Sequence, residues 1–146
     1  MRFIYLISVV VTLFFTTSCA QNAQESKESA SADKGNRIEV LDFYGTHRCV
    51  TCKSIEANAK YTVENLYPEA YKSGKIVFKT INVDEEANYD MAEKYEAVGT
   101  ALFLNVIKNG KEKHVNLTDF AFLNGMDKEA FTKGLKEKID AELKGL

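Results

Sequence analysis

IEVLDFYGTHRCVTCK, residues 38–53, joins a run of strand-forming residues to a short polar break and a pair of cysteines. Residues 38–44 are nearly continuous in apolar side chains, as is typical of a central strand buried on both faces. Residues 45–48 interrupt that pattern, and a helix is predicted from about residue 49 to residue 65, with a kink near Pro68. The cysteines therefore stand where a strand gives way to a helix.

Cys49 and Cys52 have the spacing C-x-x-C, which on a helix brings both sulfurs to one face and within reach of a disulfide. Cys49 is predicted at the N-terminus of the helix, where free backbone N–H groups and the helix dipole stabilise a thiolate. Cys52 lies one turn further in and is expected to be more buried. Cys49 is thus the expected attacking sulfur, and Cys52 the one that resolves the mixed disulfide.

Two other interpretations of this cysteine pair stay open. A structural disulfide across so short a loop would add only about 1–2 kcal/mol of stability. A soft-metal site would need ligands beyond two sulfurs, and His47 is the histidine nearest to the pair. The sequence requires no organic cofactor and indicates no resident metal.

Downstream of the cysteines, the sequence predicts two further helix–strand steps. Residues 76–83 form a second apolar strand, and Asp84 is placed to cap a helix that runs to about residue 95. Residues 101–107 form a third apolar strand. Because helices join the first three strands, we expect these strands to be mutually parallel.

The chain then turns back and ends in a helix. Asn109-Gly110 favours a two-residue hairpin because both residues adopt positive φ readily, so residues 112–117 return as an antiparallel edge strand. Residues 120–123 are predicted as a buried connection or a short extra strand, with Phe122 in the core. Asp127 caps a last helix whose apolar stripe has i+4 spacing: Phe131, Leu135, Ile139 and Leu143. The order β-α-β-α-β-β-α predicts an α/β fold with a mixed four-stranded sheet and helices on both faces.

The first nineteen residues have the pattern of an export signal. Arg2 gives a positive start, and residues 3–15 form an apolar run of about a dozen residues, too short to span a bilayer comfortably. The small residues before Cys19 resemble the lipobox of bacterial lipoproteins, in which the cysteine becomes the first mature residue and carries diacylglycerol. Thr16 stands where that family usually has leucine. Cleavage after Ala20 and a single anchoring helix are the alternatives.

Domain boundaries follow from composition. Residues 20–36 contain no large apolar side chain and are predicted to form a disordered tether, and residues 37–146 form the folded domain. A formal net charge of −2 gives no basic surface, which argues against nucleic acid as a partner. We expect a monomer in the bacterial cell envelope, attached to the membrane through lipid on Cys19, with its domain in the periplasm or otherwise outside the cytoplasm.

From residue 37 to residue 146 the chain resembles thioredoxin. The matching segments follow the family's order: VLDFY at 40–44, the cysteine pair, VFKTINVD at 77–84, residues 95–99, LFL at 102–104 and KNG at 108–110. The resemblance implies a thioredoxin-like fold and a protein thiol–disulfide oxidoreductase. It also implies exchange with thiols and disulfides of other proteins, and a separate redox partner that recharges the site.

By that resemblance, Asp42 is a buried carboxylate beneath the thiols. Burial should raise its pKa and let it take or return the proton of Cys52. Lys79 would be the partner of Asp42. Thr100 and Ala101 occupy the turn that offers backbone groups to the substrate in the family.

The sequence departs from the family around the dithiol. Arg48 replaces the tryptophan before the first cysteine, and with His47 it should add positive charge that favours the thiolate. Val50 and Thr51 replace the usual glycine and proline between the cysteines. The proline of the turn opposite the dithiol is missing, since the only proline is Pro68.

These observations predict a cell-envelope thiol–disulfide oxidoreductase that acts through Cys49 and Cys52. Two alternatives belong to other classes of protein. One is a copper or other soft-metal carrier that uses the same cysteines. The other is a thioredoxin-like scaffold whose dithiol is incidental.

Overall fold

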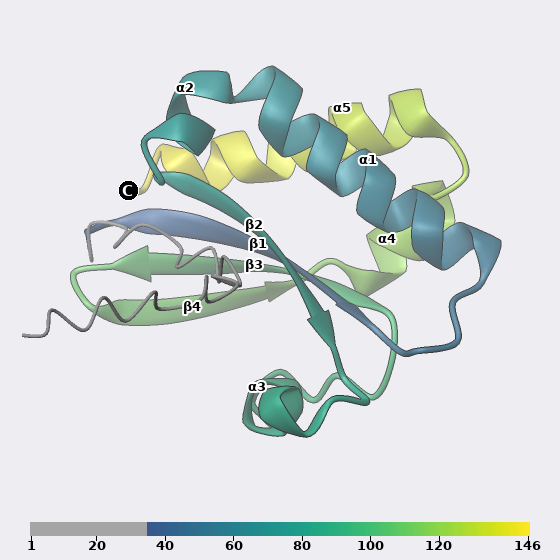
Figure 1. The fold of residues 1–146 in the computed structure, drawn as a ribbon. Coiled ribbons are helices and arrows are strands. Elements are labelled where there is room, and N and C mark those ends of the chain that lie inside the picture. Colours follow the sequence, from purple (N-terminus) through teal and green to yellow (C-terminus); the bar gives the residue numbers. More distant parts are fainter. Residues whose placement is uncertain (1–34) are drawn as a thin grey trace, which may run out of the picture.

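The structure is a computed structural model that describes residues 35–146 (Figure 1). The predicted signal peptide, Cys19 and most of the predicted tether therefore lie outside the described residues. The described elements, in chain order, are β1 (Arg37–Tyr44), α1 (Val50–Leu66), α2 (Pro68–Lys72), β2 (Ile76–Asn82), the 3-10 turn η1 (Glu86–Asn88), α3 (Tyr89–Lys94), β3 (Ala101–Lys108), β4 (Lys111–Asn116), α4 (Thr118–Asn124) and α5 (Lys128–Leu143).

The four strands form one mixed sheet in the order β2-β1-β3-β4. Helices α1, α2, α4 and α5 lie over one face of this sheet, and α3 lies against the other (Figure 1). The predicted α/β fold with a mixed four-stranded sheet and helices on both faces is confirmed. No helix within residues 35–146 combines the length and apolar character needed to cross a membrane.

The direction of β3 differs from the prediction. β1 pairs with β2 in parallel, but it pairs with β3 in antiparallel fashion, as β3 does with β4. The expectation of three mutually parallel strands is therefore wrong. Helix α3 has six residues and is about 9 Å long, too short to carry the chain back along the sheet. The chain consequently enters β3 at the end of the sheet where it left β2.

Strand β1 is buried on both faces and divides the core in two. Ile38 and Val40 contribute to the larger core, under α1 and α5, whereas Leu41 and Phe43 pack on the α3 side. Because side chains alternate along a strand, Asp42 shares the face of Ile38 and Val40. The sheet therefore presents Asp42 to the side on which α1 lies.

The hairpin and the last helix follow their local signals. Asn109 and Gly110 both have positive φ between β3 and β4, as predicted. The Asp127 carboxylate accepts hydrogen bonds from the backbone N–H groups of Glu129 and Ala130, which caps α5. Phe131, Leu135 and Ile139 of its stripe are fully buried, and Leu143 is half-buried.

Two local predictions are wrong because tertiary contacts override them. Asp84 does not cap a helix: its carboxylate accepts the backbone N–H of Thr46 at 2.6 Å, and α3 begins only at Tyr89. Residues 120–123 belong to helix α4 instead of a strand. Phe122 lies on the outer side of that helix and is 45% exposed, so it is not a core residue.

Gly125, between α4 and α5, fits closely against the helix that carries the cysteines. A Cβ atom there would lie 2.9 Å from Ile55 Cγ1 and 3.2 Å from Thr51 Cγ2, and 2.8 Å from the backbone oxygen of Ala121. Asn58 of α1 also donates a hydrogen bond to the Gly125 carbonyl at 3.1 Å. The α4–α5 connection is thus fixed against the first turns of α1.

We expect Gly125→Ala to destabilise the protein by about 1–3 kcal/mol, because the added methyl group has no room beside rigid backbone. Urea unfolding measures the difference in free energy. Gly99→Ala is the control and should change stability little, since a Cβ there meets no atom within 4 Å. Equal stability of the two variants would contradict the close fit.

Candidate dithiol site

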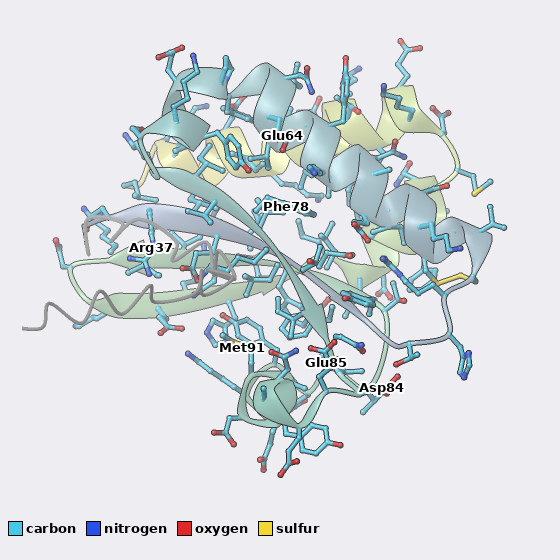
Figure 2. The ribbon with its side chains drawn as sticks, in the orientation of Figure 1. Arg37, Glu64, Phe78, Asp84, Glu85 and Met91 are labelled. Atoms are coloured by element: carbon cyan, nitrogen blue, oxygen red, sulfur yellow. A yellow bond between two sulfur atoms is a disulfide. The ribbon has the colours of Figure 1, made fainter. Side chains whose placement is uncertain are left out.

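The two cysteines form a disulfide at the N-terminus of α1, with their Cα atoms 5.1 Å apart. The side-chain view shows this bond in yellow at the start of the helix (Figure 2). Cys49 is the N-cap residue, and its sulfur accepts the backbone N–H of Cys52 at 3.1 Å. Cys49 is exposed, whereas Cys52 is 8% exposed. The structure thus places an accessible outer sulfur and a covered inner sulfur where the spacing predicts them.

The N-cap position gives Cys49 a specific electrostatic environment. The first backbone N–H groups of a helix have no partners within the helix and carry partial positive charge. One of them, that of Cys52, already points at the Cys49 sulfur. A thiolate formed at Cys49 on reduction would accept this hydrogen bond, and this stabilisation favours the nucleophilic form.

Asp42 lies near the C-terminal end of β1 and has no exposed side-chain surface. Burial raises the pKa of its carboxyl group to about 7. The guanidinium of Arg48 opposes that rise, and the negative charge of Glu56 adds to it. Asp42 is therefore a carboxyl group that can gain or lose a proton near neutral pH, as a proton-transfer group beneath the dithiol must.

Arg48 turns inward over Asp42, although the sequence suggested a charge beside Cys49. Its Nη2 atom lies 3.4 Å from Asp42 Oδ2 and donates to the carbonyl of Cys52 at 3.2 Å. Its Nη1 atom pairs with the Glu56 carboxylate. The guanidinium also covers the ring of Tyr44 at 4.3 Å, and the side chain is only 15% exposed.

Lys79 does not contact Asp42, which corrects the expected pairing. Lys79 stands opposite Leu41 in the β1–β2 register, and Thr80 stands opposite Asp42. Because successive side chains of a strand point to opposite faces, Lys79 and Asp42 lie on different sides of the sheet. Lys79 instead pairs with the buried Glu39 at 2.9 Å. Arg48, from the loop, has the place beside Asp42 that the resemblance gave to Lys79.

The structure brings Thr100 and Ala101 to the end of the sheet where the dithiol lies. Ala101, the first residue of β3, pairs with Phe43 near the end of β1, and Thr100 directly precedes it. Both are at least partly covered by neighbouring residues. Their role in holding a substrate stays a prediction.

His47 is exposed in the loop before Cys49. No group of three or more His, Cys, Asp or Glu side chains among residues 35–146 is placed to hold a metal ion.

The sequence did not predict the contacts of Arg48, and it did not predict Glu56 as a residue of the site. Arg48 was singled out, but its inward contacts were not foreseen. Glu56 was missed, although one signal for it exists: it follows Cys52 by four residues on a helix, and such residues share a face.

No protein-family model and no curated protein matches the sequence. Among solved structures, the thioredoxin of Fasciola hepatica is similar, with 24% identity and a TM-score of 0.44 over 75% of this chain and 84% of its own. Mitochondrial thioredoxin 3 of Saccharomyces cerevisiae, in its oxidized form, is 25% identical with a TM-score of 0.43 over 71% and 81%. The strand order β2-β1-β3-β4 and the dithiol at the N-terminus of α1 make this a thioredoxin-like fold.

Asp42→Asn should stabilise the oxidised protein at alkaline pH and change it little at acid pH. The folded-state pKa of about 7 exceeds the ordinary value of 3.8, so the folded chain holds the proton more tightly than the unfolded chain. The resulting stability is fully present below about pH 4 and is lost as pH rises through 7. We expect an advantage of roughly 1–4 kcal/mol for the variant at pH 8, measured by urea unfolding. An advantage of the same size at pH 4 and pH 8 would contradict the shifted titration.

Proposed function

We propose that this chain is a protein thiol–disulfide oxidoreductase that exchanges a dithiol and a disulfide with other proteins through Cys49 and Cys52. The observation that carries this proposal is the geometry of the pair: an exposed sulfur caps α1, and a covered sulfur lies behind it. A buried carboxyl group with a pKa of about 7 lies on the face of the sheet toward that helix. A purely structural disulfide requires neither an exposed sulfur nor this carboxyl group.

In the reducing direction, the Cys49 thiolate attacks one sulfur of a partner's disulfide and forms a mixed disulfide. The partner's first sulfur leaves as a thiolate and takes a proton from solvent. Cys52 then gives its proton to the Asp42 carboxylate, and its thiolate attacks the Cys49 sulfur. The partner's second sulfur leaves and is protonated. The partner has gained two electrons, and this chain holds the Cys49–Cys52 disulfide.

The oxidising direction runs through the same atoms in reverse, so the site serves either role. A separate dithiol or disulfide partner restores the starting state after each turnover. Its redox potential relative to that of this chain sets the direction.

We further propose that the domain works in the cell envelope, held to a membrane by lipid on Cys19. The support comes from the sequence: a positive start, a short apolar run and small residues directly before the cysteine. A tether of polar residues from 20 to 36 would let the domain reach membrane and soluble partners alike.

The two cysteines should behave differently on mutation. We expect Cys49→Ser to abolish reduction of insulin by dithiothreitol-charged protein, because the attacking sulfur is gone. Cys52→Ser should still attack but not resolve, so mixed disulfides on Cys49 should accumulate and be identifiable by mass spectrometry. Cys49→Ser is the control for trapping. Equal insulin reduction by wild type and Cys49→Ser would contradict the oxidoreductase assignment, and so would a Cys52→Ser variant that captures no protein.

Lipidation is tested with the full chain expressed in a Gram-negative bacterium. We expect wild type to incorporate radiolabelled palmitate and to sediment with membranes. Cys19→Ala should lose the label, whereas Cys49→Ser should keep it. Label retained by Cys19→Ala, or an unlabelled wild type, would contradict the proposed anchor.

A further inference from the structure

Arg48 connects three groups around the covered sulfur. Its Nη2 atom lies between Asp42 Oδ2 at 3.4 Å and the carbonyl oxygen of Cys52 at 3.2 Å, and its Nη1 atom pairs with Glu56. The cation therefore contacts the backbone of the resolving cysteine and the buried carboxylate with the same nitrogen. Stacking of the guanidinium on the ring of Tyr44 holds it in this position.

The two oxygens of Asp42 are not equivalent. Oδ2 faces Arg48, whereas buried Oδ1 has no hydrogen-bond partner among residues 35–146. A proton accepted by Asp42 therefore goes most favourably to Oδ1, because protonation of Oδ2 would place the proton against a cation. Asp42 thus has one oxygen, Oδ2, that contacts Arg48 and another, Oδ1, that can accept a proton.

We infer that Arg48 is a positioning residue that favours the ionised form of Asp42 and directs the Cys52 proton to Oδ1, while Glu56 limits this effect by sharing the guanidinium. This inference rests on the proposed exchange function and deepens it. The side-chain contacts of Arg48 are with Asp42, Glu56, Tyr44 and the backbone carbonyl of Cys52, and we infer that it acts through Asp42. The resemblance gives a lysine to Asp42 and tryptophan to position 48, so a cation reaching Asp42 from the loop before the first cysteine is specific to this chain.

The total charge of Asp42, Glu56, Arg48 and Cys52 stays the same through the proton transfer. With Asp42 ionised, the two carboxylates and Arg48 sum to one negative charge. When Cys52 gives its proton to Asp42, that carboxyl group becomes neutral, and Arg48 stays paired with Glu56. Cys52 then carries the negative charge as a thiolate until it attacks Cys49 and the partner's sulfur leaves. Glu56 therefore keeps the guanidinium from being left buried without a counter-charge.

No other charged group competes in this position. Within the described residues, the charges that act on Asp42 are those of Arg48 from the loop and Glu56 from α1. Its neighbours across the sheet, Thr80 of β2 and Leu102 of β3, carry no charge. Two further ionisable groups contact Arg48: Tyr44, whose ring lies under the guanidinium, and Cys52, which can ionise only when reduced.

The test is the titration of Asp42 in the folded, oxidised full chain, followed by NMR of carbon-13-labelled aspartate carboxyl groups. Asp42→Asn identifies the signal by its loss. We expect Arg48→Gln to raise the titration midpoint by about 1 pH unit or more, and Glu56→Gln to lower it. Arg48→Lys should restore most of the wild-type midpoint, because it returns the charge. An unchanged midpoint in a folded Arg48→Gln variant would overturn the inference.

Arg37→Gln is the matched control. Arg37 also pairs with a buried glutamate, Glu39, at 3.0 Å, but it lies at the other end of the sheet from the disulfide (Figure 2). We expect its removal to leave the Asp42 midpoint in place. A shift as large as that of Arg48→Gln would show a general loss of positive charge and would overturn the specific role of Arg48.

The pH profile of disulfide exchange gives a second, separate readout. Arg48→Gln should shift the acidic limb of the pH–rate profile to higher pH, by the same number of pH units as the Asp42 midpoint. The same substitution should not shift this limb in an Asp42→Asn background. A shift that persists in that background would overturn the action through Asp42. Failure of the proposed function would look different: wild type would exchange no faster than Cys49→Ser, whatever Asp42 does.

Discussion

The burial of Asp42 beneath the dithiol helix is the constraint from which the rest of the site follows. A carboxylate without exposed surface is costly unless it is protonated or paired with a cation. Asp42 is partly protonated near neutral pH and is also partly paired, with Arg48. Its pKa rises to about 7, and Arg48 turns back from the loop to meet it. The loop that lets Arg48 do so also delivers Cys49 to the exposed start of α1. The buried carboxyl group with a pKa of about 7 and the exposed position of Cys49 are thus two results of one arrangement.

Much of the fold could be predicted because its signals are local. The apolar run of β1, the Asn109-Gly110 turn and the Asp127 cap each depend on neighbouring residues, and each appears in the structure. The direction of β3 could not be read in this way. It depends on the segment between β2 and β3, where α3 has only six residues and Asp84 accepts the backbone N–H of Thr46 beside the paired ends of β1 and β2.

The residues of the site also divide into those that the sequence predicts and those that depend on tertiary contacts. The spacing placed Cys49 and Cys52 correctly, and the resemblance to thioredoxin placed Asp42 in the interior. The prediction that Lys79 partners Asp42 depended on the register between β1 and β2. A shift of one residue in that register moves a side chain to the opposite face of the sheet, and Lys79 lies on the face away from Asp42. An arginine in a polar loop gives no sign of pointing inward, since its contacts with Asp42 and Glu56 arise only on folding.

The central claim is that Cys49 is ionised and accessible because it caps α1. The most direct measurement is the pH dependence of its alkylation by iodoacetamide in the reduced full chain, resolved by mass spectrometry of the Cys49 peptide. A free cysteine titrates with a pKa of about 8.5, and the N-cap position should lower the midpoint by about 1 unit or more. A midpoint near 8.5, or a Cys49 that resists alkylation at every pH, would contradict the claim.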